Sequence, residues 1–181
     1  MPSSDPIDRF TACLKVVLDN EGGFADDPQD PGGPTKQGVT LNMLSAYLGR
    51  SATIADLKAL TPRQLGDIYS HYFWRPAHAA DCPAGVDLMV LDAAVNSGPA
   101  RAVRWLQQAV GVMPDGAVGP ATLKALGAEP PERVITLYAA LRTSFLRGLP
   151  DASHFPGWFS RVTRTAASAQ AMASASERKA S

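Results

Sequence analysis

Hydrophobic residues recur at intervals of three and four along most of the chain, which is the spacing of one face of an α-helix. The first such segment begins near Asp5-Pro6, a helix-capping residue followed by proline at the first helical position. Gly22-Gly23 is expected to end this helix. Its apolar face consists of Ile7, Phe10, Leu14, Val17 and Leu18. No segment alternates Val, Ile and Thr as a half-buried strand does, so the pattern predicts an all-α fold.

Capping residues mark the beginning of further helices. Thr61-Pro62-Arg63-Gln64 combines a cap, a proline at the first position and a glutamine three residues after the cap. Thr53 and Asp56 form a similar pair around a short helical turn. Hydrophobic spacing predicts the remaining helices at about 41–48, 84–96, 100–110 and 120–126, after Pro130-Pro131, and from about Phe155.

Two segments lack helical periodicity. Residues 24–40 are rich in Asp, Gly and Pro and are expected to form one long irregular loop, with room for a short hairpin. Compact domains rarely keep such a loop without a functional reason. From Ala166 onward almost only Ala, Ser and polar residues remain, so this tail is expected to be weakly helical or disordered, because it has little to bury.

Composition narrows the function classes. The 181 residues suffice for one globular domain, with or without a small module, and 17 basic residues balance 17 acidic ones. Nucleic-acid binding usually requires a basic excess, so we do not expect it. No segment approaches the roughly 18 apolar residues of a membrane span. Because the N-terminus lacks the basic and apolar regions of a signal peptide, we expect synthesis in the cytoplasm.

The two cysteines and three histidines give no sign of a metal centre. Cys13 lies on the apolar face of the first helix and Cys82 lies in a loop, without the paired spacing of a zinc site or a disulfide framework. His71, His78 and His154 are far apart in sequence. We therefore expect no metal and no cofactor.

Glu21 differs from the other glutamates in its position. It lies three, four and seven residues after Leu18, Val17 and Leu14, so it continues the apolar stripe of the first helix. Partial desolvation there would raise its pKa toward the range that a general acid needs. Position alone favours a structural role, as a capping or salt-bridged residue. The other three glutamates are interpreted as solvated: Glu129, Glu132 and Glu177.

The loop after Glu21 is rich in carboxylates. Asp26, Asp27 and Asp30 precede Pro31-Gly32-Gly33-Pro34-Thr35. Glycoside hydrolysis commonly needs an acid and a second carboxylate, which this loop supplies. Turn chemistry is the alternative interpretation, because Asp, Pro and Gly are the usual turn residues. A calcium loop is disfavoured, since the spacing of alternating aspartates with a distal glutamate is missing.

Further polar and aromatic candidates are ambiguous. In the run Tyr72-Phe73-Trp74, an exposed Tyr72 or Trp74 would suit stacking on a sugar, whereas core packing is the alternative. Asn96 suits a hydrogen bond to an acetamido group or a helix C-cap equally well. Asp92 lies among apolar residues, where a buried structural hydrogen bond is favoured over catalysis.

The residues from Glu21 to Thr40 resemble the signature of the glycoside hydrolase family 108 N-acetylmuramidases. The run reads Glu21-Gly22-Gly23-Phe24-Ala25-Asp26-Asp27-Pro28-Gln29-Asp30-Pro31-Gly32-Gly33-Pro34-Thr35-Lys36-Gln37-Gly38-Val39-Thr40. Phe24 replaces the family's usual Tyr, and Val39 its usual Ile. The resemblance spans about residues 7–165. It continues in Tyr72-Phe73-Trp74, in Asp92-Ala93-Ala94-Val95-Asn96-Ser97-Gly98-Pro99, in Trp105-Leu106-Gln107-Gln108, in Asp115-Gly116 with Gly119-Pro120 and Thr122, and in Gly157-Trp158 with Arg161-Val162.

This resemblance implies a lysozyme-like helical catalytic domain with a small helical peptidoglycan-binding part. It also implies cleavage of the β-1,4 bond between N-acetylmuramic acid and N-acetylglucosamine, with Glu21 as the general acid. The second catalytic group stays open. Asp30, Asp26 and Asp27 are candidates as carboxylates, and Thr35 and Thr40 as hydroxyls that position a water.

We therefore expect a muramidase domain over 1–98, a peptidoglycan-binding part over 99–165 and a polar tail over 166–181. The expected partners are peptidoglycan and a holin for export, because the family includes phage endolysins and muramidases of holin-assisted secretion. We expect a monomer acting in the periplasm or cell wall. Phage lysis, a gene-transfer particle and protein export remain alternative settings.

Three other functions fit the same residues. A lytic transglycosylase also uses one glutamate but leaves a 1,6-anhydro end instead of adding water. A silent peptidoglycan-binding protein would not need Glu21 or its loop. A structural component of a phage-like particle would copurify with particles and would not clear a cell-wall suspension.

Overall fold

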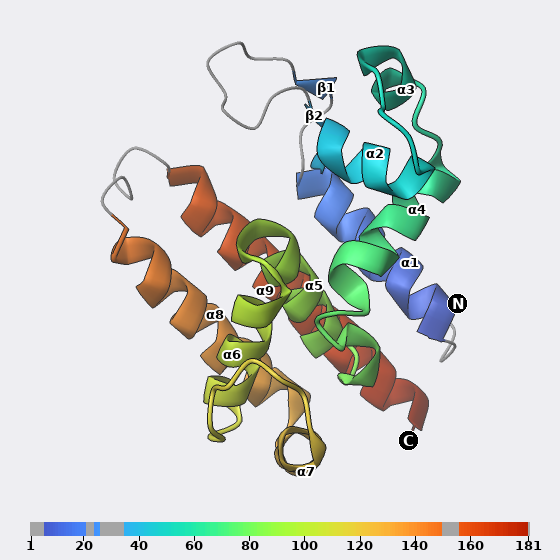
Figure 1. Ribbon diagram of the computed structural model, residues 1–181. Helices are drawn as coiled ribbons and strands as arrows, with labels where there is room; N and C mark the ends of the chain where they lie inside the picture. The colour runs from blue at the N-terminus through green and yellow to red at the C-terminus, as the bar shows by residue number, and fades with distance from the viewer. Residues whose placement is uncertain (1–5, 21–23, 26–34, 150–155, 181) are drawn as a thin grey trace.

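The computed structural model describes residues 6–20, 24–25, 35–149 and 156–180 (Figure 1). Helices dominate these residues, and the strands among them are only two residues long. The predicted all-α class is confirmed. In the part of the chain that the structure describes, no helix is long and apolar enough to cross a membrane.

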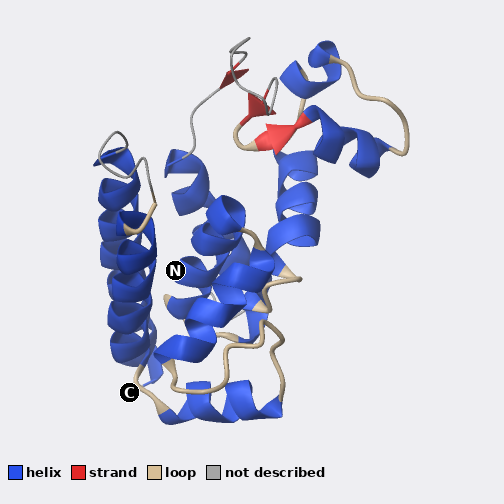
Figure 2. Cartoon of the chain, turned by 60° about the vertical axis from the view of Figure 1, so that its left-hand side comes forward, coloured by secondary structure: helices blue, strands red, loops and turns tan. Residues whose placement is uncertain are grey.

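The first half of the chain forms α1 and a small lobe at one end of the molecule. Figure 2 shows the strands at this end, beside α2 and α3. Both predicted caps are present, because Thr53 and Thr61 each form a complete capping box. The elements are α1 (Pro6–Asn20), β1 (Phe24–Ala25), β2 (Thr35–Lys36), β3 (Val39–Thr40), α2 (Leu41–Leu48), α3 (Ile54–Lys58) and α4 (Pro62–Tyr69).

A three-stranded antiparallel sheet in the order β1-β2-β3 forms within the predicted loop segment. Gln37 and Gly38 connect β2 to β3, and both have positive φ, at 49° and 76°. Positive φ at both central residues is the geometry of a type I′ turn, which matches the twist of the paired strands. The buried Tyr69 hydroxyl donates to the Gln37 carbonyl at 2.6 Å and so fixes this turn against α4.

The second half of the chain builds the larger part of the molecule. A π-helical turn, η1 (Ser70–Trp74), continues α4, and a 3-10 turn, η2 (Ala79–Asp81), leads toward the central helix. The remaining helices are α5 (Val86–Ser97), α6 (Pro99–Ala109), α7 (Pro120–Ala128), α8 (Pro131–Arg147) and α9 (Pro156–Ala180).

Helix α5 lies at the centre of the fold. It contacts α1, α6, α8 and α9, and every residue from Val86 to Ala94 is buried. A helix that is apolar on all sides has no solvent face, so its few polar side chains must find partners inside the protein. Asp87 accepts from the Arg9 guanidinium at 2.6 and 2.9 Å and from the Gly85 and Leu88 amides. Burial nevertheless raises the pKa of Asp87.

The segment expected as a polar tail at 166–181 is helical as part of α9 up to Ala180, and buried residues continue as far as Ala173. Thr165, Ala169 and Ala173 are fully or almost fully buried. Their small size lets the α9 backbone approach α5 closely. A Cβ placed on Gly85 would lie 2.3 Å from the Ala169 carbonyl oxygen. Small side chains therefore provide the packing here, and the spacing of large apolar residues does not predict it.

This contact gives a stability prediction for Gly85→Ala. The substitution combines a strained φ of +86° with a backbone clash against Ala169, and we expect it to cost about 3 kcal/mol in free energy of unfolding. Gly98→Ala is the matched control, since Gly98 has φ +83° and open space around its Cβ. Urea unfolding of both variants measures the difference. Equal losses would show that the Gly85–Ala169 approach contributes nothing.

Candidate active site

The predicted catalytic position lies between the end of α1 and the start of the sheet. Glu21, Asp26, Asp27 and Asp30 lie outside the residues that the structure describes. The α1 stripe that leads to position 21 is described, and its residues Leu14 and Val17 are buried as expected. Position 21 is therefore covalently joined to a helix whose preceding apolar residues are fixed in the core.

Asn20, the last residue of α1, contacts the C-terminal helix. Its Nδ2 lies 3.4 Å from the Thr165 hydroxyl oxygen, to which it donates. Its Oδ1 accepts from Nε and Nη2 of Arg164, each at 3.4 Å. These partners lie about 145 residues away along the chain, so sequence patterns contain no signal for the contact.

Thr35 and Thr40 are directly paired across β2 and β3. Cross-strand partners present their side chains on the same face of a sheet, so the two hydroxyls are neighbours. The Thr40 oxygen also accepts from the Met43 amide at 3.2 Å, which makes Thr40 the N-cap of α2. The Thr40 hydroxyl therefore caps the start of α2 and lies on the same face of the sheet as the Thr35 hydroxyl. Its own hydrogen is still available to donate.

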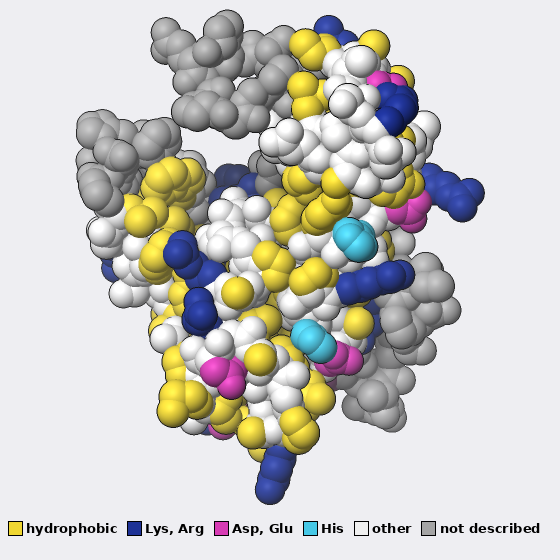
Figure 3. All heavy atoms as spheres, in the orientation of Figure 1, with side chains coloured by type: hydrophobic (Ala, Val, Ile, Leu, Met, Phe, Trp, Pro, Cys, Tyr) yellow, Lys and Arg dark blue, Asp and Glu magenta, His cyan; other side chains and the backbone are white. Residues whose placement is uncertain are grey.

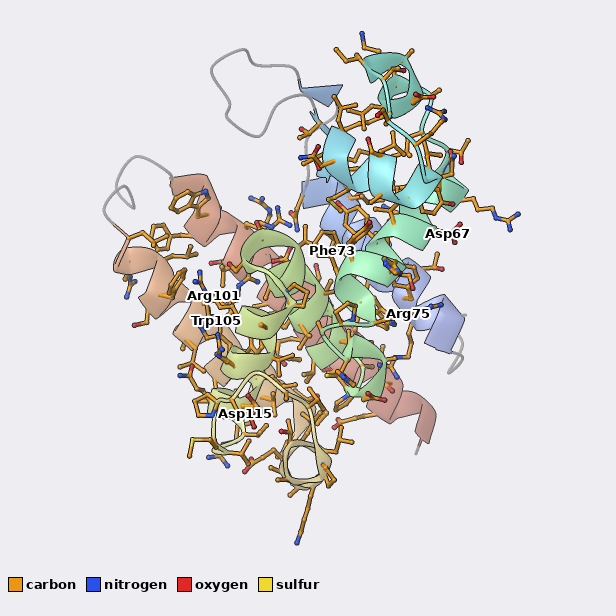
Figure 4. The ribbon with its side chains drawn as sticks, viewed as in Figure 1. Asp67, Phe73, Arg75, Arg101, Trp105 and Asp115 are labelled. Atoms are coloured by element: carbon orange, nitrogen blue, oxygen red, sulfur yellow. The ribbon has the colours of Figure 1, made fainter. Side chains whose placement is uncertain are left out.

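The aromatic run occupies the π-helical turn η1. Figure 4 shows Phe73 on this turn, near α5, with Asp67 on the preceding α4 and Arg75 directly after the turn. Trp74 is only 5% exposed and packs against Phe10 with ring centroids 5.2 Å apart, whereas Tyr72 is half-buried beside His71. The structure thus gives Trp74 a packing role, and sugar stacking by Trp74 stays a prediction. π-helical turns often occur at functional sites.

Asn96 lies in the last turn of α5 and is exposed. Its side-chain amide donates to the Asp92 carbonyl at 2.6 Å, one helical turn earlier. This bond orients the carboxamide and leaves its oxygen as an acceptor. A contact between Asn96 and substrate stays a prediction.

Asp92 forms a buried ionic cluster with two arginines. Its carboxylate accepts from Arg142 of α8 at 2.7 Å and from Arg161 of α9 at 2.9 Å. Asp92 is completely buried, and the Arg142 side chain is almost completely buried. The interpretation of Asp92 as a structural residue agrees with this geometry, because both of its oxygens are used to join α5, α8 and α9.

The Asp115-to-Thr122 motif is organised by one side chain of α6. The Gln107 amide donates to Asp115 at 2.7 Å and to Thr122 at 3.2 Å, and its oxygen accepts from the Gly116 amide at 2.8 Å. Figure 4 shows Asp115 below Arg101 and Trp105 of the same helix. The Ala117 amide and Gln107 lower the pKa of Asp115. The motif residues therefore fix the loop between α6 and α7.

A pocket of about 460 Å³ opens between Arg9 of α1, residues 80–83 and α7. None of the predicted site residues that the structure describes lines it. Cys82 borders it and is buried, and burial raises the pKa of Cys82 and of the buried Cys13 well above the ordinary thiol range. Neither thiol is therefore expected to act as a nucleophile near neutral pH.

Charged side chains are dispersed over the visible face of the molecule. Figure 3 shows basic and acidic groups scattered among hydrophobic and neutral ones. This distribution agrees with the zero net charge of the sequence.

Comparison with known proteins gives two adjoining matches. The family model described as "Glycosyl hydrolase 108" matches residues 14–98, and the one described as "Predicted Peptidoglycan domain" matches residues 101–171. The solved structure of Brucella abortus SagA is similar to this chain, with 44% sequence identity and a TM-score of 0.81. The similarity covers 91% of this chain and 95% of that chain. No curated protein sequence matches.

Proposed function

Because the chain belongs to the glycosyl hydrolase 108 family, we propose that it cuts the β-1,4 bond between N-acetylmuramic acid and N-acetylglucosamine. The chain is a glycoside hydrolase, and it is a peptidoglycan hydrolase of the lysozyme type. The observation that carries the bond specificity is the intact run from Glu21 to Thr40, which joins α1 to α2 through the small sheet.

In the proposed mechanism Glu21 is the general acid. Its carboxyl proton passes to the glycosidic oxygen as the bond from that oxygen to C1 of the muramic acid breaks, so the leaving sugar departs as an alcohol. A water then forms a new bond to C1 and gives its proton to a base. One water is consumed for each bond cut, and Glu21 regains its proton from solvent.

Asp30 is the proposed base, and Asp26 and Asp27 are proposed to contact the substrate. Thr40 is the proposed partner in positioning the water, and its pairing with Thr35 supports this role, because two adjacent hydroxyls can orient one water molecule. The distance between the Glu21 carboxyl and the second carboxylate decides whether the configuration at C1 is inverted or retained. A second carboxylate that acts as a base needs room for a water molecule, whereas one that acts as a nucleophile does not.

Tyr72 and Asn96 are the proposed sugar contacts among the described residues. Tyr72 is half-buried on the π-helical turn, so its side chain is partly exposed, as stacking on a sugar requires. Asn96 has its amide group fixed by Asp92, which leaves a preoriented carbonyl oxygen for an acetamido N–H. Trp74 stays a proposed sugar contact as well, although its ring is buried against Phe10.

We also propose that the catalytic and wall-binding parts meet at Gly98, which ends α5 and begins α6. Residues 1–98 would carry catalysis and residues 99–165 wall binding, as the positions of the two matched segments support. The proposed setting is phage-type lysis or holin-assisted export, with a monomer acting in the periplasm or cell wall. Copurification with particles would instead favour a gene-transfer or phage-like setting.

Mass analysis of the released muropeptides tests the proposed reaction. Purified peptidoglycan is digested to completion, and the products are compared with those of a known muramidase. We expect reducing muramic acid ends that carry one added water per bond cut. Products ending in 1,6-anhydro-muramic acid would show that the chain is a lytic transglycosylase and not a hydrolase. Products cut on the other side of the muramic acid would contradict the proposed bond.

A further inference from the structure

The pocket beside Arg9 lies where the two matched segments of the chain meet. One side is formed by α1 and by residues 80–83, which belong to the hydrolase match, and the other by α7, which belongs to the peptidoglycan-domain match. Figure 1 shows α7 at the end of the molecule opposite α2 and α3. The pocket is therefore separate from the paired threonines of the sheet.

Two side chains of opposite charge line this pocket. Arg9 is partly exposed, with 24% of its side chain accessible, and Asp81 is more so, at 50%. The Asp81 carboxylate meets one side chain among the described residues, His78, whose Nδ1 lies 3.0 Å from Oδ2. Its other oxygen is left as an acceptor. A ligand with an ammonium and a carboxylate group would therefore find a partner for each charge.

Arg9 is held in a fixed orientation, but not all of its donors are used. Its Nε and Nη2 donate to Oδ2 of the buried Asp87, at 2.9 and 2.6 Å, and Nη2 also donates to the Cys82 carbonyl. Nη1 donates to none of the residues that the structure describes, so it is the group left for a ligand carboxylate. Because Asp87 already balances the Arg9 charge, a carboxylate alone is expected to bind weakly, and the second contact at Asp81 is needed.

The α7 side of the pocket is apolar. Leu123 is 41% exposed although it is a large hydrophobic residue, and Leu126 lines the same side. An apolar wall next to two charges favours a ligand with aliphatic carbons between its charged groups. The volume of about 460 Å³ lies within the range of small-ligand sites, roughly 300–1,000 Å³. A neutral sugar such as N-acetylglucosamine would satisfy neither charge.

We propose that this pocket binds the peptide stems of peptidoglycan. A stem that is not crosslinked carries a free ammonium on its diamino acid, carboxylates, and aliphatic carbons between them. The ammonium would pair with Asp81, a carboxylate with Arg9, and the aliphatic carbons with Leu123. A crosslink through the ammonium removes its charge, so the pocket would select uncrosslinked wall. This inference rests on the proposed function, since it takes peptidoglycan as the substrate.

Calorimetric titration with a synthetic stem peptide tests the pocket directly. The probe is L-alanyl-γ-D-glutamyl-diaminopimelic acid, whose N-terminus is acetylated because the stem is joined to the sugar there. We expect saturable binding to the full chain. Acetylation of the diaminopimelate ammonium, or amidation of the diaminopimelate carboxylates, is expected to raise Kd about tenfold in each case. Equal affinity for the three peptides would overturn the proposal, because the charges would then play no part.

Asp81→Asn tests the ammonium contact from the side of the protein. It is expected to raise Kd for the unmodified peptide about tenfold and to leave Kd for the acetylated-ammonium peptide unchanged, because both changes remove the same ion pair. Asp67→Asn is the matched control, since Asp67 is exposed, accepts from Tyr47 at 3.1 Å and does not line the pocket. Losses that multiply would exclude Asp81 as the partner of the ammonium. The amidated peptide tests Arg9, whose own substitution would unpair the buried Asp87.

Leu123→Ser tests the apolar wall. We expect it to raise Kd about threefold, because part of the aliphatic contact is lost. Leu137→Ser is the matched control, since Leu137 of α8 is exposed to a similar extent, at 39%, and lies outside the pocket. The same loss in both variants would contradict a contact at Leu123.

Cleavage assays on purified peptidoglycan separate this inference from the proposed function. A chain that releases the expected muropeptides but does not bind the stem peptide rejects the pocket as a stem site and leaves the proposed reaction intact. A chain that binds the peptide with the stated charge dependence but does not cut the β-1,4 bond rejects the proposed reaction and supports the stem site.

Discussion

Replacing Glu21 with glutamine is expected to slow peptidoglycan cleavage about a thousandfold, because the amide keeps the side-chain shape but has no acidic proton to give. The leaving sugar would then depart as an unprotonated alkoxide, which is a poor leaving group. Turbidity loss of a cell-wall suspension measures the rate over this range. The same samples should pellet with cell walls as the unchanged protein does, since binding does not need the proton.

Glu177→Gln is the control for Glu21→Gln. Glu177 is exposed on the last turns of α9, beyond the proposed wall-binding part at 99–165. We expect its substitution to leave the cleavage rate unchanged. Clearance of cell walls by Glu21→Gln at the full rate would remove Glu21 from the mechanism and favour a carboxylate of the following loop.

Asp92→Asn is expected to lower the free energy of unfolding by about 4 kcal/mol. The substitution leaves the guanidinium groups of Arg142 and Arg161 close together without a counter-charge, in a place where water cannot replace it. Breaking a buried ion pair from one side typically costs about 3–5 kcal/mol. Urea unfolding measures this as a lower midpoint at an unchanged slope.

Asp19→Asn is the matched control for Asp92→Asn. Asp19 also pairs with a cation, Lys15, at 2.7 Å, but both side chains are well exposed. Surface pairs of this kind contribute little, so we expect almost no change in the unfolding midpoint. If the two substitutions had the same small effect, the cluster that joins α5, α8 and α9 would not be a stabilising feature of the folded chain.

The helix boundaries could be predicted where their signals are local. Thr61 and Gln64 cap each other within four residues, and α2 occupies 41–48 as its hydrophobic spacing predicts. Such signals need no knowledge of the remaining fold. The sequence is compatible with the short hairpin around Gln37-Gly38 but does not predict it. Strands of two residues are too short to show an alternation of polar and apolar residues.

Two features could be recognised only from the three-dimensional structure. The burial of α9 depends on small residues such as Ala169 meeting Gly85, and a single sequence does not reveal which glycine an alanine faces. The π-helical turn shifts the helical register at η1, so 3.6-residue spacing could not decide which of Tyr72, Phe73 and Trp74 is buried.

The proposed catalytic residues could be identified because they form one contiguous run from Glu21 to Thr40. Contacts between residues far apart in the sequence could not be identified in this way. Asn20 meets Thr165 only after the chain has folded, and neither residue type is unusual at its place in the sequence. Likewise, Asp92 was interpreted as structural from its apolar surroundings, but its arginine partners come from two distant helices.

The packing of α9 on α5 has a consequence for the order of events during protein synthesis. The catalytic segment emerges first, yet its central helix stays uncovered on one side until residues 156–180 have been made. A nascent chain that stops earlier would display the apolar surface of α5 and leave Asn20 without its partners. A wall-degrading enzyme built in this way is expected to acquire its activity only after residues 156–180 have been added.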